Sequence, residues 1–326
     1  MRAASEDRRL LAESLARVVQ GHAGAGLRRE LGAGDWLWPA ADEGLLPRAA
    51  HVVEVGLVLG RESAPLPWSH LVLAASLLER AAIPRAREHL QALARGEPAV
   101  AVLADARGPV PVVDAAAASL LVVVDDHGRR IRLLEQPAKL QPRPVRTLDG
   151  LEAAWIDAAQ LPDSWASLRV PDAWHEALDW ALLASCARIA GLLQRLVRQT
   201  VAFVDTRRQF GVVVGSFQAV QHRAVDLHIA AEELRALLHA TEAAMDRAER
   251  AAAVARLRIK CARSARVVMQ GAVQLHGAMG LTRELPVGAA VLAVEAELAR
   301  HAGAAQCAAR LLPPEPGTGL QGTIRC

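Results

Sequence analysis

The sequence predicts a mainly α-helical protein with a small β unit in its middle. Two observations predict this class. Apolar residues recur three and four positions apart over residues 5–95 and again after Pro171, and short runs rich in β-branched residues lie between these regions. A chain of 326 residues is long enough for two or three packed units. In chain order we expect an N-terminal helical domain over 1–97, a reduced β-domain over 98–170, a C-terminal four-helix bundle over 171–312 and a tail over 313–326.

The N-terminal helices are predicted by apolar positions such as Leu11, Leu15 and Val18, which fall on one helical face. Residues 60–68 must interrupt them. Pro65 and Pro67 each remove a backbone donor, and each pushes the preceding residue away from helical angles.

The β unit is predicted by three short apolar runs at residues 99–103, 120–124 and 131–134. Pro, Gly or Asp bounds these runs, and residues 125–128 are expected to form a hairpin turn between the second and the third.

The C-terminal region is predicted to form long helices that each bury one face. Seven apolar residues on the third of these helices are spaced alternately three and four apart, so they form one stripe. A similar stripe follows on the next helix, and long antiparallel helices with such stripes pack as a four-helix bundle. The first stripe consists of Phe217, Val220, Ala224, Leu227, Ala231, Leu234 and Leu238.

The composition argues against a nucleic-acid-binding protein. Only Lys139 and Lys260 are lysines, so 36 of the 38 basic residues are arginines, and the net charge is +3. Arginines and acidic residues are interspersed, and aromatic residues make up only 3% of the chain. A groove for nucleic acid needs clustered charge and stacking side chains, so we expect no nucleic-acid partner.

Membrane insertion, secretion and metal binding are also not expected. Charged residues or histidines interrupt every long apolar stretch, and the N-terminus lacks the apolar core of a secretory signal. The four cysteines form no CxxC pair, which argues against a zinc site or a disulfide framework and fits a cytoplasmic location. His228 and Glu232 share a helical face, but no third ligand lies within a turn of both.

Two motifs stand out in the C-terminal region. Arg207, Phe210 and Gly211 form an Arg-x-x-Phe-Gly sequence, and Gln218 follows after six residues. The second motif runs Gln-x-x-Gly-Ala-x-Gly and ends at Gly280. Both motifs, in this order, resemble the C-terminal domain of acyl-CoA dehydrogenases, where the second has Gly at the position of Ala278. Weaker resemblances to the same family lie at residues 60–67 and 147–150.

The resemblance implies FAD as the cofactor, bound between subunits. In the family, the matching residues serve the flavin of the neighbouring subunit, so a dimer is implied. The chemistry agrees: a guanidinium can bind a pyrophosphate with charge-assisted hydrogen bonds, amides can bind the adenosine end, and glycines let backbone N–H groups approach closely. Taken singly, the same residues would more readily be solvated helix-end charges and helix terminators, and only both motifs together in the family's order favour a flavin-binding half-site. The predicted cofactor-binding residues are Arg207, Phe210, Gln218, Gln274 and Gly277.

The catalytic base of the family is not found at its expected positions. The family reaction removes a proton α to a thioester, with a Glu as base, and passes the β-hydrogen to the flavin. Counting along the family pattern places Ala181 at one known position of this Glu and His301 at the other. We therefore predict no catalytic residue in this chain. The nearest substitutes, Asp179, Glu295 and Glu297, are expected to be surface carboxylates.

The loops that hold flavin within one subunit are also missing from the β unit. The family has a Thr-Glu-Pro-x-x-Gly-Ser-Asp loop and a Trp-Ile-Thr/Ser strand there. Between residues 99 and 170 the only hydroxyl side chains are Ser119, Thr147, Ser164 and Ser167. The Trp-Ile-Asp sequence at 155–157 resembles the second motif only superficially, because it belongs to a later strand.

The resemblance thus predicts an acyl-CoA dehydrogenase subunit that desaturates an acyl-CoA thioester only together with a homologue. The chain would complete the FAD site of a catalytic subunit in an α2β2 heterotetramer, as in short bacterial members of the family that act on steroid side-chain thioesters. An electron-transfer flavoprotein is the implied acceptor. Two alternatives stay open: a self-sufficient homodimer that uses Asp179 or Glu295 as the base, and a non-enzymatic scaffold derived from the family.

Overall fold

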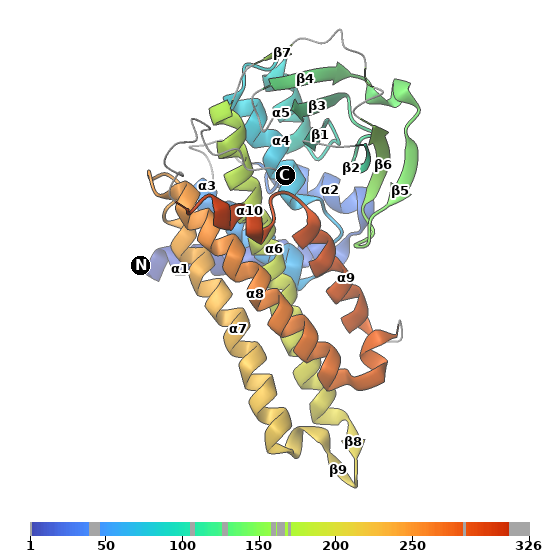
Figure 1. Cartoon of the computed structure of the whole chain (residues 1–326), viewed down its shortest axis with the longest axis vertical. Coiled ribbons are helices and arrows are strands. Elements are labelled where there is room, and N and C mark those ends of the chain that lie inside the picture. Colours follow the sequence, from blue (N-terminus) through green and yellow to red (C-terminus); the bar gives the residue numbers. More distant parts are fainter. Residues whose placement is uncertain are drawn as a thin grey trace.

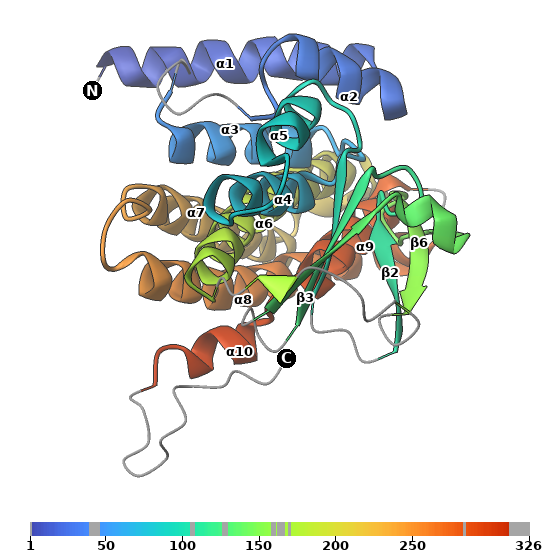
Figure 2. The same cartoon turned by 90° about the horizontal axis from the view of Figure 1, so that it is seen from above.

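The computed structural model describes residues 2–38, 46–104, 108–125, 130–157, 161, 167–168, 171–282 and 285–312. Five helices form its N-terminal part. The outer pair, α1 and α2, lies over α3 and α5, and α4 and α6 lie beneath them (Figure 2). The predicted break is confirmed, because α3 ends at Arg61 and α4 begins at Trp68 after both prolines. The bounds are α1 (Arg2–Gly21), α2 (Gly24–Ala33), α3 (Arg48–Arg61), α4 (Trp68–Arg80) and α5 (Ala86–Ala94).

The first sheet contains the three predicted strands. β1 (Val100–Ala104) runs parallel to β3 (Leu120–Asp125), which pairs antiparallel with β4 (Arg130–Glu135). A short strand, β7 (Ser167–Leu168), adds to the far side of β4. The predicted hairpin turn at 125–128 lies largely outside the described residues.

The second sheet was only partly predicted. It has the order β2-β6-β5, with β2 (Pro109–Val113) and β5 (Arg143–Arg146) at its edges and β6 (Glu152–Asp157) between them. Pro109, Pro111 and Pro144 obscure the strand pattern of both edge strands. An edge strand tolerates proline because one side of it donates no ladder hydrogen bond.

The C-terminal part is built around α6 (Pro171–Thr206), which packs against α3, α4, α7 (Gln218–Glu242), α8 (Arg250–His276) and α9 (Pro286–Ala299) (Figure 1). The part of α6 from Asp172 to Thr206 is long and apolar enough to cross a membrane, but 89% of its most apolar window is buried inside the protein. It is therefore a core helix. A short α10 (Ala304–Ala309) follows α9.

Glycines allow the close crossing of α3 and α6. A Cβ at Gly191 would lie 2.2 Å from the carbonyl oxygen of Leu57, and one at Gly60 would lie 2.1 Å from that of Arg188. The two backbones can approach this closely only without side chains at these positions. The crossing fixes Arg188, which belongs to the charge network described below.

The stripe on α7 is buried over only part of its length. Leu227, Ala231, Leu234 and Leu238 are in the core, but Phe217 is 41% exposed. Val220 and Ala224 are half-buried. The prediction of one continuous buried face is therefore wrong at the start of α7, because this end projects beyond the rest of the molecule (Figure 1).

Candidate cofactor half-site and buried charge network

The projecting end of the helices carries the first motif. After α6 the chain forms a small hairpin of β8 (Arg208–Gln209) and β9 (Val212–Val213), followed by a short 3-10 helix, η4 (Val214–Ser216) (Figure 1). The N–H of Val214 donates to the carbonyl of Arg207 at 2.8 Å and closes the hairpin. Gln221 Nε2 donates to the carbonyl of Gly215 at 3.0 Å and joins the loop to α7.

This hairpin presents the predicted residues to solvent. Arg207 is exposed at its base, and Gln218 is the exposed first residue of α7. Phe210 lies at the tip with a positive φ of 51° and is 90% exposed. Its ring makes an edge contact with Phe217 at 6.5 Å between centroids. A ring this exposed buries little apolar surface within the single chain, so it fits an intermolecular contact.

The second motif lies at the same end of the bundle. Helix α8 ends at His276, and the buried ring of His276 stacks on Phe203 of α6 at 4.4 Å. This contact places the end of α8 against the last turn of α6, just before the hairpin. Gln274 is exposed on the last turn of α8 and lines an open cavity of about 590 Å³ between α8 and α9.

Gly277 has a backbone conformation that favours glycine and is not obstructed by neighbouring atoms. Its φ of 63° and ψ of −147° are essentially restricted to glycine, and a Cβ there would point into open space. Gly280, by contrast, is packed, since its Cβ would lie 2.9 Å from the carbonyl oxygen of Val273. An exposed guanidinium, exposed amides and an open glycine backbone are groups that fit part of a dinucleotide. All of them are exposed near the same end of the helices, so a second surface would have to complete such a site.

Neither of the two counted positions of the family base holds a carboxylate. Ala181 is fully buried in the apolar core of α6. His301 lies just after α9, with a positive φ of 57°, and lines a pocket.

Asp179 is not a surface carboxylate, so that expectation was wrong. Its side chain is 2% exposed and forms ion pairs with Arg310 at 2.7 Å and with Arg250 at 3.3 Å. Arg310 follows α10 and Arg250 begins α8, so Asp179 holds both segments against α6. Its structural pairing with two arginines argues against its use as a base.

Glu297 is likewise buried, which corrects the second expectation. Its Oε2 atom lies 2.6 Å from both Arg188 Nη1 and Arg300 Nη1, and its Oε1 accepts a hydrogen bond from Ser69 Oγ at 2.7 Å. Burial alone would raise the pKa of Glu297, but the two guanidinium groups and Ser69 outweigh it and hold the pKa well below its usual range. Of the three substitutes, only Glu295 is exposed as expected.

Asp149 completes a network of two carboxylates and two guanidinium groups. It pairs with Arg300 at 2.6 Å and with Arg188 at 3.1 Å, and its side chain is 1% exposed. The network connects the β unit through Asp149, α6 through Arg188, α9 through Glu297 and α4 through Ser69. The sequence showed Asp149 only as part of a weak resemblance at 147–150, so the network was missed.

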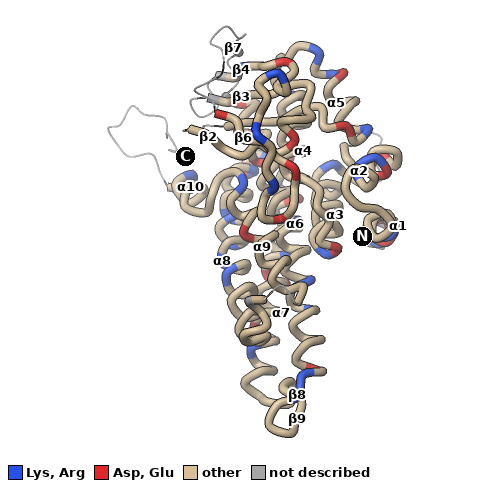
Figure 3. The backbone as a smooth tube through the Cα atoms, turned by 90° about the vertical axis from the view of Figure 1, so that its right-hand side faces the viewer, with Lys and Arg blue, Asp and Glu red and all other residues tan. Residues whose placement is uncertain are grey.

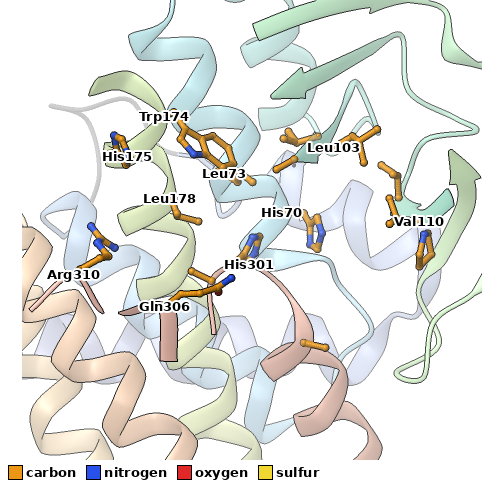
Figure 4. A pocket seen from close by; sticks show the side chains of 16 residues that line it. His70, Leu73, Leu103, Val110, Trp174, His175, Leu178, His301, Gln306 and Arg310 are labelled. Atoms are coloured by element: carbon orange, nitrogen blue, oxygen red, sulfur yellow. The ribbon is translucent and has the colours of Figure 1, made fainter. Parts of the chain in front are cut away.

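A pocket beside this network has a volume of about 310 Å³ and is lined by a pair of histidines (Figure 4). The rings of His70, on α4, and His301 lie 5.0 Å apart between centroids. Burial, aided by the charge of Arg300, lowers the pKa of His70 to about 4. Burial and the neighbouring His70 lower the pKa of His301 well below its usual value. Both imidazoles are therefore uncharged at neutral pH.

These lowered pKa values predict a loss of stability in mild acid. Below pH 6.5, these histidines become protonated in the unfolded chain. In the folded chain, His70 stays uncharged until about pH 4. The free energy of unfolding should therefore fall with pH, by up to about 1.4 kcal/mol per pH unit for each such histidine. Asp149 and Glu297, whose pKa values are lowered, add a loss at still lower pH. Urea unfolding of wild type and His70→Asn between about pH 7 and pH 5 tests this, because equal slopes would contradict it.

In the described part of the chain, neither the charged side chains nor the possible metal ligands indicate another site. In Figure 3 the basic and acidic positions are dispersed among the elements rather than gathered on one of them. Within the described ranges, no group of three or more His, Cys, Asp or Glu side chains could hold a metal ion. Cys186, Cys261 and Cys307 are free, buried thiols.

Comparison with known proteins identifies the family. The model of the acyl-CoA dehydrogenase C-terminal domain matches residues 172–303. The acyl-CoA dehydrogenase IpdE2 of Mycolicibacterium smegmatis is 30% identical over 303 residues, which cover 86% of this chain and 89% of that protein. IpdE2 of Mycobacterium tuberculosis is also 30% identical, over 86% of this chain and 88% of its own. The chain belongs to the acyl-CoA dehydrogenase family.

Solved structures confirm the predicted fold class. The Tcur3481-Tcur3483 steroid acyl-CoA dehydrogenase has a TM-score of 0.78 at 19% identity, covering 94% of this chain and 97% of that one. The ChsE4-ChsE5 complex of Mycobacterium tuberculosis has a TM-score of 0.74 at 21% identity, covering 94% and 96%. The chain therefore has the acyl-CoA dehydrogenase fold, and the family uses FAD.

Proposed function

We propose that this chain is the non-catalytic subunit of a heteromeric acyl-CoA dehydrogenase and completes the FAD site of a catalytic homologue. One observation carries the proposal: the predicted flavin-binding residues lie exposed at the projecting end of the helices, while the counted base positions inside the chain hold Ala181 and His301. The chain thus offers a surface to a neighbour and lacks the base for its own reaction. FAD, when bound, supplies the hydride acceptor for α,β-desaturation of an acyl-CoA thioester.

Each residue of the half-site has a distinct task in this proposal. The Arg207 guanidinium binds the pyrophosphate, because a planar cation can donate two hydrogen bonds to it. The Gln218 and Gln274 amides bind the adenosine end, where they can both donate and accept. Gly277 lets its backbone approach the dinucleotide, and Phe210 packs against the partner or the cofactor with its exposed ring.

The uncovered apolar surface supports a partner at this end. Phe217, Val225 and Ile229 are 41%, 55% and 49% exposed on or beside α7, in addition to the exposed Phe210. A soluble protein rarely leaves such a set uncovered unless another chain packs there. The names of two similar structures describe ChsE4-ChsE5 and Tcur3481-Tcur3483 assemblies, which agrees with an α2β2 arrangement here. The partner would bind the acyl-CoA, with an electron-transfer flavoprotein as acceptor, in the cytoplasm.

Reconstitution tests the proposal. This chain and a homologue from the same genome that has both flavin loops and a Glu base would be purified separately and together. We expect acyl-CoA turnover only with the complex, and we expect it to survive replacement of Glu295 by Gln in this chain. Turnover by the isolated chain would support a self-sufficient homodimer instead. If no complex forms, or if the complex retains no flavin, a family-derived scaffold is the better description.

A further inference from the structure

We propose that Cys186 and Cys261 are a redox-sensitive thiol pair, in which Cys261 is a thiolate that balances the buried charge of Arg258. On reaction with hydrogen peroxide, the pair forms a disulfide that links two helices. Cys186 lies on α6 and Cys261 on α8, and these helices pack directly against each other (Figure 1). The pair lies inside the single chain, so this proposal rests neither on the flavin half-site nor on a partner subunit.

The Arg258 guanidinium is a buried cation without a carboxylate partner. Arg258 is 1% exposed. Its Nε donates to the carbonyl of Ala302 at 3.1 Å, and its Nη2 donates to the carbonyls of Leu298 at 2.6 Å and Arg300 at 3.3 Å. Among the described residues, no carboxylate forms an ion pair with Arg258, and its Nη1 is enclosed without a hydrogen-bond partner. A buried charge is unfavourable unless an opposite charge compensates it, so an anion is expected nearby.

Three thiols are the groups best placed to supply this anion. Cys186, Cys261 and Cys307 are each 0% exposed and lie on α6, α8 and α10. The thiols act on the charge of Arg258 more strongly than Glu297 does, and together these groups raise the pKa of Arg258 against the effect of burial. Glu297 is already paired with two other arginines. A thiolate is therefore the expected counter-ion.

Cys261 is the thiol that carries the charge. It accepts a hydrogen bond from the Cys186 thiol, and this bond, together with Arg258, lowers the pKa of Cys261 despite its burial. Burial and the same hydrogen bond raise the pKa of Cys186 well above its usual value, so Cys186 keeps its proton. Burial also raises the pKa of Cys307. A thiolate and a thiol in contact are the two partners that disulfide formation needs.

Peroxide supplies the oxidant for this reaction. The Cys261 thiolate attacks one oxygen of hydrogen peroxide, so that an S–O bond forms, the O–O bond breaks and hydroxide leaves. The Cys186 sulfur then displaces the oxygen of the sulfenic acid, and the proton of Cys186 leaves with that oxygen as water. The two sulfurs lose two electrons, and the peroxide gains them. Arg258 lines the open cavity between α8 and α9, so a molecule as small as peroxide can approach from this side.

The disulfide would loosen the segment that joins α9 to α10. Its formation consumes the thiolate and leaves the charge of Arg258 uncompensated in the interior. Arg258 holds this segment through the carbonyls of Leu298, Arg300 and Ala302. A buried cation that has lost its anion gains free energy by moving toward water, which weakens these three hydrogen bonds. Oxidation of the pair is therefore a switch for the order of the segment.

Peroxide treatment of the full chain tests the proposal. Cys326 lies outside the described residues, so Cys326→Ser would be made in every protein to remove a competing thiol. Peptide mapping by mass spectrometry would identify the products. We expect a link between Cys186 and Cys261 that forms about tenfold faster than Cys307 is oxidised, because an ordinary thiol is only a few per cent ionised at pH 7. Equal oxidation rates for Cys261 and Cys307, or no link, would overturn the proposal.

The pH dependence of the reaction distinguishes a thiolate from an ordinary thiol. An ionised Cys261 should react at a rate that changes less than about threefold between about pH 6.5 and 8, whereas an ordinary thiol reacts roughly tenfold faster for each pH unit. Cys186, Arg258 and Glu297 act on Cys261, and the shifts of their pKa values keep their charges constant over this range. A steep profile would contradict the proposal.

Variants then assign the roles within the pair. Cys186→Ser should leave a sulfenic acid on Cys261 that dimedone traps, without a link. Arg258→Met should make the pH profile steep and Arg258→Lys should keep it flat; the wild-type profile decides if neither variant folds. Cys307→Ser is the matched control, a second buried thiol near Arg258, and should form the link at the wild-type rate.

Hydrogen exchange measures the switch itself. Backbone amides of residues 298–302 should exchange about tenfold faster in the oxidised chain, because a hydrogen bond from a charged group contributes roughly that factor or more. The Cys261→Ser chain treated with the same peroxide should show no such increase. Equal exchange in the oxidised and reduced wild-type chains would show that the disulfide does not release the segment.

Discussion

Glu297→Gln is expected to lower the free energy of unfolding by roughly 3–5 kcal/mol, the usual effect of removing one member of a buried ion pair. Gln keeps the shape of the side chain but removes its charge. Asp149 would then be the one carboxylate left in the network to pair with Arg188 and Arg300. The interior would therefore hold one uncompensated positive charge. Because the network joins α4, α6, α9 and the β unit, the loss should appear as one cooperative shift in the urea midpoint.

Glu295→Gln is the control for this experiment. It lies two residues earlier on the same helix, but it is exposed, so we expect a change within about 0.5 kcal/mol. The comparison also separates two interpretations of Glu297. A displaced catalytic base would lose turnover with little change in stability. A stable Glu297→Gln protein whose complex has lost activity would therefore contradict the structural account.

Arg207→Ala is expected to weaken FAD binding in the complex with the homologue by about tenfold to a hundredfold, the usual contribution of a charge-assisted hydrogen bond. The side chain is exposed at the hairpin base, so its removal should leave folding and assembly intact. Flavin retention after dialysis and fluorescence titration of the apo-complex would measure the change.

Arg235→Ala is the matched control for Arg207. Arg235 is an exposed arginine on α7, paired with Glu232 at 2.7 Å and more than four turns from the start of that helix. We expect its replacement to leave flavin affinity unchanged. If Arg207→Ala retains flavin as well as Arg235→Ala does, Arg207 does not bind the cofactor, and the scaffold alternative gains support.

Local sequence patterns predicted the helices and the central strands well. The spacing of apolar residues defined the helices before and after the β unit, and Pro65 and Pro67 marked the break between α3 and α4. The strands β2 and β5 were missed because their prolines oppose a strand assignment, and only their edge positions make them tolerable. Such positions depend on tertiary structure.

The exposed and buried parts of the site differed in how far they could be predicted. Arg207 and Gly277 belong to short motifs that each lie within a few residues, so the sequence pointed to them directly. The charge network joins Asp149 to Arg188 and Arg300, which are 39 and 151 residues away. Composition predicts exposed carboxylates, and only the fold shows that Asp179 and Glu297 have guanidinium partners that allow their burial.

Flavin stoichiometry tests the central claim most directly. The complex of this chain with its catalytic homologue would be purified, and FAD released by denaturation would be quantified against the concentration of each chain. Our account predicts one FAD for each pair of unlike chains and none on this chain alone. Each flavin needs a catalytic subunit with both flavin loops and the half-site of this chain. One FAD on every chain, or a stoichiometric flavin on the isolated chain, would contradict it.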